Sequence, residues 1–222
     1  MISFMLFIQG KMICKHQASS FKADRIILEL GCGDGLLLRK LLEAERTGDT
    51  IQNNSSKSFY IGIECDNLKY NKARSVVEHF SNVKLLNGSF EVIIHEFSDC
   101  SIDKIISVLP DPEFIDIRHQ YRWRKFYSVL NRKLIANGSL RIVTELIDDL
   151  LQPVTADAYD TWVQEIVEIF GELGFSLIRV LDGSPLEYES ECLRRFKQDP
   201  QRIRLASFDF AKTSRNFNSA VL

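Results

Sequence analysis

Glycines and carboxylates gather where short apolar runs of the sequence stop. Residues 25–30 form such a run, and it ends in the turn Gly31-Cys32-Gly33-Asp34-Gly35. Three glycines let the backbone turn tightly and approach a ligand without a Cβ in the way. Residues 36–42 follow with leucines at helical spacing, so the turn joins a buried strand to a helix. This order predicts a ligand site at the carboxyl end of the strand, where the amide groups of the helix offer donors.

The spacing of these glycines favours a nucleoside over a dinucleotide. A dinucleotide site has the pattern G-x-G-x-x-G, whereas this chain has G-x-G-x-G. Glu29, two residues before the first glycine, would repel a pyrophosphate and attract a ligand with amino and sulfonium charges. Glu64 ends a second apolar run, residues 59–64, and can accept two hydrogen bonds from a ribose diol. The alternative is a glycine-rich turn in some other doubly wound protein.

These two segments resemble known cofactor motifs. Residues 29–35 resemble motif I of the class I S-adenosylmethionine-dependent methyltransferases, and Gly62-Ile63-Glu64 resembles their second motif. The resemblance implies S-adenosylmethionine as the cofactor, with its methionine part at the glycine turn, its ribose at Glu64 and its adenine near residues 87–90. It also implies a Rossmann-like, doubly wound α/β fold with a seven-stranded sheet, mostly parallel with an antiparallel last strand. The cofactor-binding residues predicted in this way are Glu29, Gly31, Cys32, Gly33, Glu64, Cys65, Ser89, Phe90 and Leu109.

A second set of motifs lies further along the chain. From about residue 25 to residue 212 the sequence resembles the tRNA (guanine-N7-)-methyltransferase family, which has Pro-Asp-Pro-Trp after the fourth strand. This chain has Leu109-Pro110-Asp111-Pro112 there, followed by Glu113 in place of the tryptophan. The family's Thr-Asp pair corresponds to Thr144-Glu145, and its Thr-x-Tyr/Phe-Glu motif to Leu186-Glu187-Tyr188-Glu189. Ser89 stands where the family has an aspartate, and Asp116 falls near a family lysine.

The chemistry of guanine N7 determines which residues this reaction needs. N7 carries a lone pair and no proton, so positioning matters more than a general base. Methylation makes the purine cationic, and nearby carboxylates stabilise that charge. One carboxylate can also accept hydrogen bonds from guanine N1–H and N2–H₂. We therefore predict three catalytic carboxylates, Asp111 first, with Glu145 and Glu189.

Each of these carboxylates also has a simpler interpretation. Asp111 can be a turn residue between two prolines, because aspartate is common in turns. Glu145 and Glu189 can be ordinary surface charges. A hydroxyl or carbon-acid substrate would need a base, and Asp111 could serve there too.

Two basic clusters offer sites for phosphates. The stretch from Arg118 to Lys133 contains six Arg or Lys residues and one His, without an acid, and includes Tyr121 and Trp123. It could hold phosphates and stack a base, or it could be a solvated helix face with Trp123 turned to the core. A second cluster, residues 194–204, follows Glu189 and flanks the same strand ends if the topology is as predicted. The RNA-binding residues that we predict are Arg118, His119, Arg122, Arg124, Lys125 and Tyr188.

Strands and helices alternate along the chain, which positions these groups. Strands are predicted at residues 25–30, 59–64, 83–86, 104–109, 139–144, 175–180 and 204–210. Helices are predicted at residues 36–42, 67–80 (with Asn67 as N-cap), 90–97, 121–134 and 156–173, with a surface loop at 46–58 and a turn at Asn137-Gly138. This order predicts parallel βαβ units with helices on both faces. The last two strands have no clear helix between them, which predicts an antiparallel edge.

Composition sets the broad class. The chain has 222 residues, a formal net charge of -2 and five cysteines without metal-ligand spacing. We therefore predict a single methyltransferase domain over residues 1–222, with reduced thiols, no metal and a cytoplasmic location. The apolar residues 1–8 are too short to span a membrane, so residues 1–20 are predicted to form an N-terminal arm and no membrane partner is expected.

The leading hypothesis is S-adenosylmethionine-dependent methylation of N7 of a guanine in tRNA. One alternative is a class I methyltransferase for a small molecule or a protein. Another is a catalytically degenerate S-adenosylmethionine-binding or partner subunit, because two substrate motifs are altered. The sequence does not indicate the oligomeric state.

Overall fold

A computed structural model describes residues 24–47, 57–148 and 150–213. The predicted N-terminal arm (residues 1–20) and most of the predicted surface loop (residues 46–58) lie outside the described residues.

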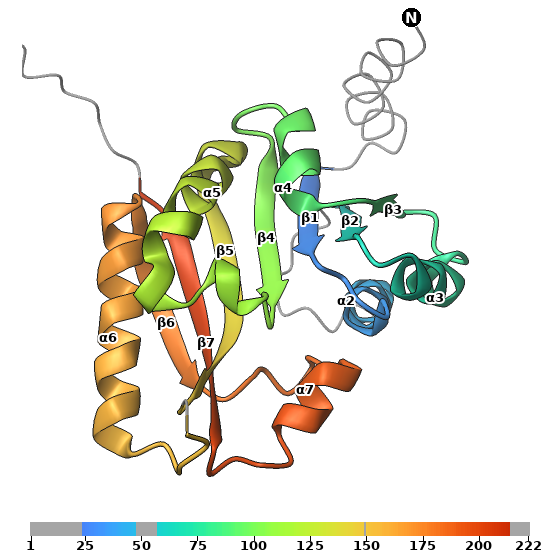
Figure 1. Cartoon of the computed structure of the whole chain (residues 1–222). Helices are drawn as coiled ribbons and strands as arrows, with labels where there is room; N and C mark the ends of the chain where they lie inside the picture. Colours follow the sequence, from blue (N-terminus) through green and yellow to red (C-terminus); the bar gives the residue numbers. More distant parts are fainter. Residues whose placement is uncertain (1–23, 48–56, 149, 214–222) are drawn as a thin grey trace, which may run out of the picture.

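Seven strands form one sheet in the order β3-β2-β1-β4-β5-β7-β6 (Figure 1). Their bounds are β1 Arg25–Leu30, β2 Ser58–Glu64, β3 Val83–Asn87, β4 Ile102–Val108, β5 Leu134–Ile147, β6 Phe175–Asp182 and β7 Ile203–Lys212. β1 to β5 pair in parallel, whereas β7 is antiparallel to both β5 and β6. The predicted Rossmann-like sheet with an antiparallel last strand is therefore confirmed.

Helices cover both faces of the sheet because alternate strand residues point to opposite sides. On one face, α2 (Leu36–Thr47), α3 (Asn67–Val77) and α7 (Glu191–Phe196) share a core with Ile27, Ile106 and Val143. On the other, α4 (Phe90–Ile93), α5 (Gln120–Lys133) and α6 (Ala156–Glu172) enclose the larger core. The short 3₁₀ turn η1 (Ile94–Glu96) follows α4, and two more, η2 (Pro112–Phe114) and η3 (Ile117–His119), lie between β4 and α5.

The structure differs from the predicted elements in several places. Asp66, rather than Asn67, caps α3, because its carboxylate accepts from the amides of Leu68 and Lys69 at 2.8 and 3.0 Å. The predicted helix at 90–97 is one α-helical turn followed by η1. The predicted turn at Asn137-Gly138 lies inside β5, where Asn137 has φ +63° and the register with β4 shifts.

A further helix, α7, separates the last two strands, although none was predicted there. Ser190 caps it by accepting from the amide of Leu193 at 3.1 Å. Six residues are too few for a helical period to show in the sequence.

Within the described residues, no helix is long and apolar enough to cross a membrane. Cys32, Cys65, Cys100 and Cys192 are free thiols. No group of three or more metal-ligating side chains is found in the same part of the chain.

Candidate functional site

The glycine turn lies at the carboxyl end of β1, and its three glycines have positive φ angles. A Cβ at Gly35 (φ +75°) would lie 2.8 Å from the Cα of Ala73, so this glycine lets α2 pack directly on α3. At Gly31 and Gly33, an added Cβ would meet nothing within 4 Å. The space above the first two glycines is therefore open to a ligand, whereas the third is needed for packing.

Three carboxylates surround this turn. Gly33 N donates to Glu64 Oε2 at 2.8 Å, and Asp66 N donates to Glu64 Oε1 at 2.8 Å. Glu29 is only 3% exposed, and its Oε2 has no hydrogen-bond partner; the same is true of the buried Asp34 Oδ2. Burial, reinforced by the charges of Asp34 and Glu64, raises the pKa of Glu29 well above its ordinary value. A ligand that carries positive charge and donors would satisfy these oxygens.

The predicted adenine side adjoins Glu64. Asn87 pairs with Glu64 in the register of β2 and β3, and Gly88 N donates to Glu64 O at 2.9 Å. Ser89 caps α4 by accepting from the amide of Glu91, and the Phe90 ring packs on Phe114 at 4.9 Å between centroids. The β3–α4 turn is thus fixed beside the carboxylate predicted to hold the ribose.

Cys65 and Leu109, two other predicted cofactor residues, stand at strand ends. Cys65 is exposed, with its Sγ 3.8 Å from Glu64 Oε1. Leu109 has φ +50°, a conformation that leucine rarely adopts, and its amide donates to Val143 O at 2.7 Å. This bond fixes the end of β4 against β5, and the chain then turns into Asp111.

Cys32 does not present a ligand group. Its thiol is buried in the core beneath α2, where a Cβ at Gly62 would lie 2.9 Å from Sγ. Its amide donates to Ile63 O and its carbonyl accepts from Gly35 N, both at 2.9 Å. Cys32 therefore shapes the turn through its buried thiol and its backbone bonds, and its role in holding the cofactor stays a prediction.

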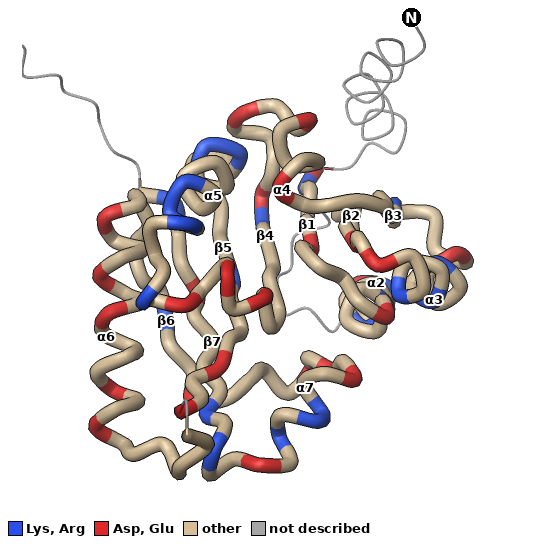
Figure 2. The backbone as a smooth tube through the Cα atoms, viewed as in Figure 1, with Lys and Arg blue, Asp and Glu red and all other residues tan. Residues whose placement is uncertain are grey.

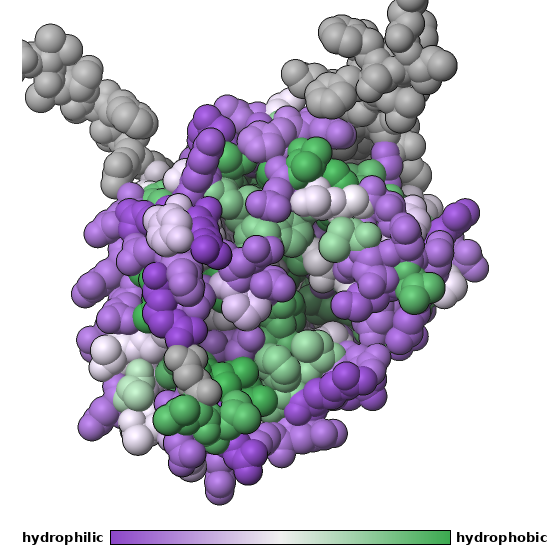
Figure 3. Space-filling model, in the orientation of Figure 1, coloured by the Kyte–Doolittle hydropathy of each residue, from purple (hydrophilic) through white to green (hydrophobic). Residues whose placement is uncertain are grey.

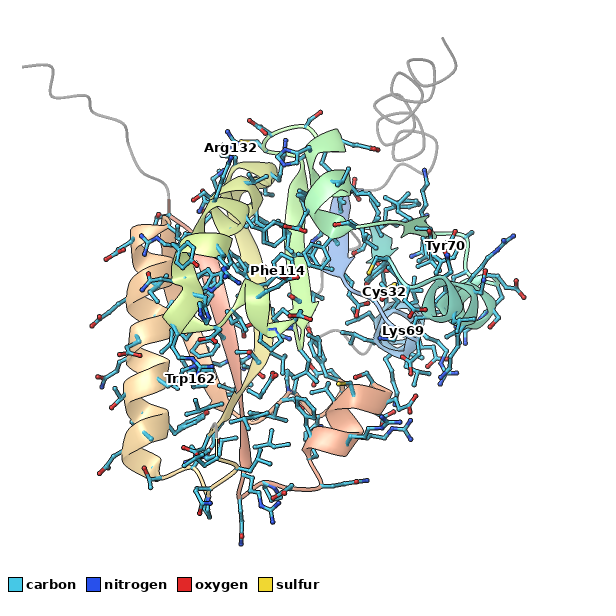
Figure 4. The ribbon with its side chains drawn as sticks, in the orientation of Figure 1. Cys32, Lys69, Tyr70, Phe114, Arg132 and Trp162 are labelled. Carbon is cyan, nitrogen blue, oxygen red and sulfur yellow. The ribbon has the colours of Figure 1, made fainter. Side chains whose placement is uncertain are left out.

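A cavity of about 490 Å³ opens at the carboxyl ends of β4 and β5. One wall comes from residues after β4 (Ile115 and Arg118 among them), a second from the end of β5 and a third from α6, including Trp162. Figure 4 shows Trp162 on α6, Cys32 on the opposite side of the molecule and Phe114 between them. Figure 3 shows apolar side chains in a central hollow of this face, surrounded by hydrophilic residues. A cavity of this size suits a planar base or a comparable small molecule.

Glu145 lines this cavity and has an unusual environment. Its side chain is largely buried, and Oε2 has no hydrogen-bond partner. Burial raises the pKa of Glu145 to about 7, and the negative charge of Asp111 acts in the same direction. Asp111 is exposed and accepts from the amide of Glu113 at 3.1 Å, so it also caps η2 as a turn residue would. The structure therefore brings two of the three predicted catalytic carboxylates together.

Glu189 and Tyr188 lie in a different setting. Glu189 is exposed, and its Oε2 is 3.3 Å from Lys40 Nζ on α2. Tyr188 is 1% exposed in the core of the α2 face, where its hydroxyl accepts from Arg141 Nη1 at 3.1 Å. The Tyr188 side chain is therefore not available to bind RNA as predicted, because its ring is buried in this core.

Comparisons with known proteins identify the family. The sequence model of a family described as "Putative methyltransferase" matches residues 23–169. The chain belongs to this methyltransferase family. A search of curated proteins gave no match. With the fold and cofactor motifs described above, it is a class I enzyme whose methyl donor is S-adenosylmethionine.

Solved structures show the same fold with different named activities. An antibiotic-related methyltransferase has a TM-score of 0.60 at 18% identity, over 90% of this chain and 92% of the other. A 16S rRNA (adenine(1408)-N(1))-methyltransferase from Catenulisporales acidiphilia has a TM-score of 0.63 at 14% identity, over 93% and 92%. Geranyl diphosphate C-methyltransferase from Streptomyces coelicolor A3(2) has a TM-score of 0.56 at 10% identity, over 86% and 71%. At these identities the likeness concerns the fold alone.

The residues of this methyltransferase fit its donor. The sulfonium and amino charges of S-adenosylmethionine match the Glu29 and Asp34 oxygens that have no hydrogen-bond partner, and the open space above Gly31 and Gly33 admits its methionine part. Glu64 stands at the end of β2, where it can accept from the ribose hydroxyls.

The predicted RNA-binding stretch of the methyltransferase is neutralised in part. Asp116 is 2.8 Å from Arg118 Nη2 and 3.3 Å from His119 Nδ1, and these contacts lower the pKa of Asp116 to about 2. Arg124 donates to Glu172 Oε2 at 2.6 Å. Arg122 and Lys125 are exposed on α5, and the Arg122 guanidinium lies over the Tyr121 ring.

Trp123 does not face solvent to stack a base; it is turned to the core, the alternative that the sequence left open. It is 1% exposed, stacks on Phe170, and donates from Nε1 to Asp116 O at 2.9 Å. The helix therefore turns its tryptophan to the core.

Sequence reasoning missed several residues around the site. Lys72 Nζ is 3.9 Å from Asp34 Oδ2, across the contact between α3 and the glycine turn. Asp148, directly after β5, and Trp162 of α6 line the cavity. Asp148 carried a usable signal, because it follows Glu145 at a strand end; Trp162 carried none, because it reads as an ordinary core residue of an amphipathic helix.

Proposed function

We propose that this enzyme methylates N7 of a guanine in tRNA as a single-domain protein of the cytoplasm. The observation that carries the proposal is Glu145, a half-buried carboxylate whose buried Oε2 has no hydrogen-bond partner, in the wall of a base-sized cavity at the strand ends. Guanine carries two adjacent donors, N1–H and N2–H₂, that one carboxylate can accept together. The motif resemblance to the tRNA (guanine-N7-)-methyltransferase family, from residue 25 to residue 212, supports the same substrate.

Each part of the site has a role in this reaction. S-adenosylmethionine, when bound, supplies an electrophilic methyl group. Glu29, Glu64 and the glycine turn hold and orient that donor, while Glu145 orients the guanine. Asp111, exposed next to the cavity, stabilises the positive charge that develops on the purine. No group has to remove a proton, because N7 has none.

The test is methyl transfer from radiolabelled donor to unmodified tRNA. We expect 7-methylguanosine in the digested product. Transcripts in which 7-deazaguanine replaces guanine should accept no methyl group, because they lack the N7 lone pair. An absence of transfer to unmodified tRNA at saturating donor would refute the proposal.

A matched variant tests the role of Asp111. Asp111→Asn keeps a side-chain oxygen for the amide of Glu113 and removes the charge. We expect kcat/KM to fall on the order of 100-fold, with donor affinity unchanged in calorimetry. A loss of donor affinity as large as the loss in kcat/KM would mean that Asp111 contacts the cofactor instead.

A small-molecule substrate is the second candidate. The cavity walls include the apolar side chains of Ile115, Leu146 and Trp162, which also suit a compact apolar compound. Salt separates the two, because phosphate contacts release counterions and make RNA methylation fall steeply as salt rises. A small neutral substrate would show little salt dependence.

A further inference from the structure

The segment between β6 and β7 runs past the carboxyl ends of the strands, where the ligand sites lie. It carries α7, which lies below the ends of β1 and β4 in Figure 1. Leu193 of α7 is buried in the core of the α2 face, and Glu191 Oε2 is 3.9 Å from Lys72 Nζ of α3. At its other end, Gln201 O accepts from the amide of Val154, a residue of the cavity wall, at 2.9 Å. The segment therefore reaches from the glycine turn to the cavity.

This segment presents positive charge to solvent. Figure 2 shows Lys and Arg gathered on α7 and on the chain that leads to β7. Arg195 pairs with Glu191, Arg202 with Asp199 and Arg204 with Asp182. Arg194 and Lys197 are exposed, and neither has an ion pair within the described parts of the chain. Residues three apart share a helix face, so these two cations point the same way.

Two cations near the start of α5 differ from Arg194 and Lys197 in their ion pairing. Arg118 and Arg124, near the start of α5, are held by Asp116 and Glu172, so binding a phosphate there requires breaking an existing contact. Arg194 and Lys197 require no such exchange. Arg122 and Lys125 of α5 are also exposed and have no ion pair within the described residues. What distinguishes Arg194 and Lys197 is their position on the segment that reaches from the glycine turn to the cavity.

We propose that α7 and the chain after it, residues 190–204, form the surface that binds the RNA backbone, with Arg194 and Lys197 as phosphate contacts. This inference rests on the proposed function. RNA fits because a base-sized cavity and a cationic surface are joined by one segment, so a strand held along α7 can place a base at Glu145. The net charge of -2 means that this local surface, rather than the whole protein, attracts the polyanion.

The test compares two double variants that remove equal charge. Arg194→Gln/Lys197→Gln changes α7. Arg46→Gln/Lys57→Gln changes two exposed residues at the end of α2 and just before β2, at the amino ends of the strands and so at the opposite edge of the sheet. Affinity for unmodified tRNA is measured by fluorescence anisotropy over a salt series, and donor affinity by calorimetry.

We expect the α7 variant to bind tRNA on the order of tenfold more weakly, with the slope of log K against log salt reduced by about 1.5. The opposite-edge variant should bind as the unaltered protein does, and donor affinity should stay the same in both. Equal binding by both variants would overturn the inference. Competition by poly-glutamate as strong as that by RNA would also overturn it, because the surface would then select no nucleic acid.

A second measurement uses the unaltered protein. Ultraviolet cross-linking to tRNA, followed by mass spectrometry, should map to the peptide that contains residues 190–204. Cross-links confined to α5 would contradict the proposal.

The two proposals fail in different ways. Methylation that persists with unaltered RNA affinity in the α7 variant removes this inference and leaves the guanine-N7 reaction. RNA binding through α7 without methyl transfer removes the guanine-N7 reaction and leaves this inference. An unaltered protein that does not bind RNA removes both.

Discussion

At the scale of single residues, buried carboxylates are the main chemical feature of this methyltransferase. Glu29 and Glu145 each keep an oxygen without a hydrogen-bond partner, and burial raises both pKa values. Leaving such groups unsatisfied costs stability, so a folded protein rarely retains them without a ligand to meet. Glu29 lies beside the glycine turn and Glu145 lines the cavity, and we propose that the first faces the donor and the second the substrate.

Glu145 gives a stability prediction with a defined sign. Its folded pKa of about 7 lies above its ordinary value of 4.5, so the folded state holds the proton more tightly. The contribution to stability is therefore present below pH 4.5 and is lost as pH rises towards 7. Glu145→Gln should leave the free energy of unfolding nearly unchanged near pH 4 and raise it above pH 7 by up to about 3 kcal/mol. Urea unfolding across this pH range measures it, and a constant offset at every pH would contradict it.

At the scale of elements, the turn from β1 to α2 carries two functions in five residues. Its first two glycines leave space for the donor, whereas Gly35 allows the start of α2 to contact Ala73 of α3. The local backbone is left-handed at all three, which a residue with a Cβ adopts only at a cost.

This division predicts unequal costs for two similar substitutions. Gly31→Ala adds backbone strain only, so it should destabilise the fold by about 1 kcal/mol. Gly35→Ala adds the same strain and places a Cβ 2.8 Å from the Cα of Ala73, so it should cost about 3 kcal/mol or more. Urea unfolding without donor compares them. Equal costs would mean that the α2–α3 contact can open freely.

At the scale of the whole molecule, the sheet separates two tasks and joins them at one edge. β1, β2 and β3 present the glycine turn, Glu64 and the adenine side, whereas β4 and β5 present Asp111, Glu145 and the cavity. Parallel strands place all these groups at their carboxyl ends. The segment that carries α7 spans both halves, which makes it the natural surface for a large substrate.

The substitution Glu29→Gln should raise the stability of the free protein and weaken its binding of the donor. Its raised pKa means that ionisation destabilises the free protein as pH rises, so Glu29→Gln should unfold at higher urea at neutral pH. The same variant loses the charge that attracts the sulfonium and amino groups, and it should bind S-adenosylmethionine about 10- to 100-fold more weakly.

Urea unfolding with and without donor measures both effects. At a donor concentration 100 times the dissociation constant of the unaltered protein, that protein gains about 2.7 kcal/mol. The variant should gain about 1.4 kcal/mol or less. An equal gain would mean that Glu29 does not face the donor.

The sequence by itself determined the sheet and the class of cofactor. Apolar runs that stop at glycines or prolines, together with alternating helices, predicted all seven strands, because strand periodicity and turn chemistry are local properties. The antiparallel last strand was predicted from the family resemblance and from the lack of a predicted helix before it, although α7 lies there. The carboxylates at Glu29 and Glu64 and the glycine spacing indicated the donor for the same reason.

Tertiary structure alone decided which charges are free and which groups meet. Asp116 neutralises Arg118 and His119, Trp123 and Tyr188 turn to the core, and the cavity joins residues from η2 to α6. The sequence predicted that the basic cluster at residues 194–204 flanks the strand ends, but it missed helix α7, which sets how Arg194 and Lys197 are presented there. These outcomes depend on contacts between segments far apart in the chain, and no local pattern of residue types encodes such contacts.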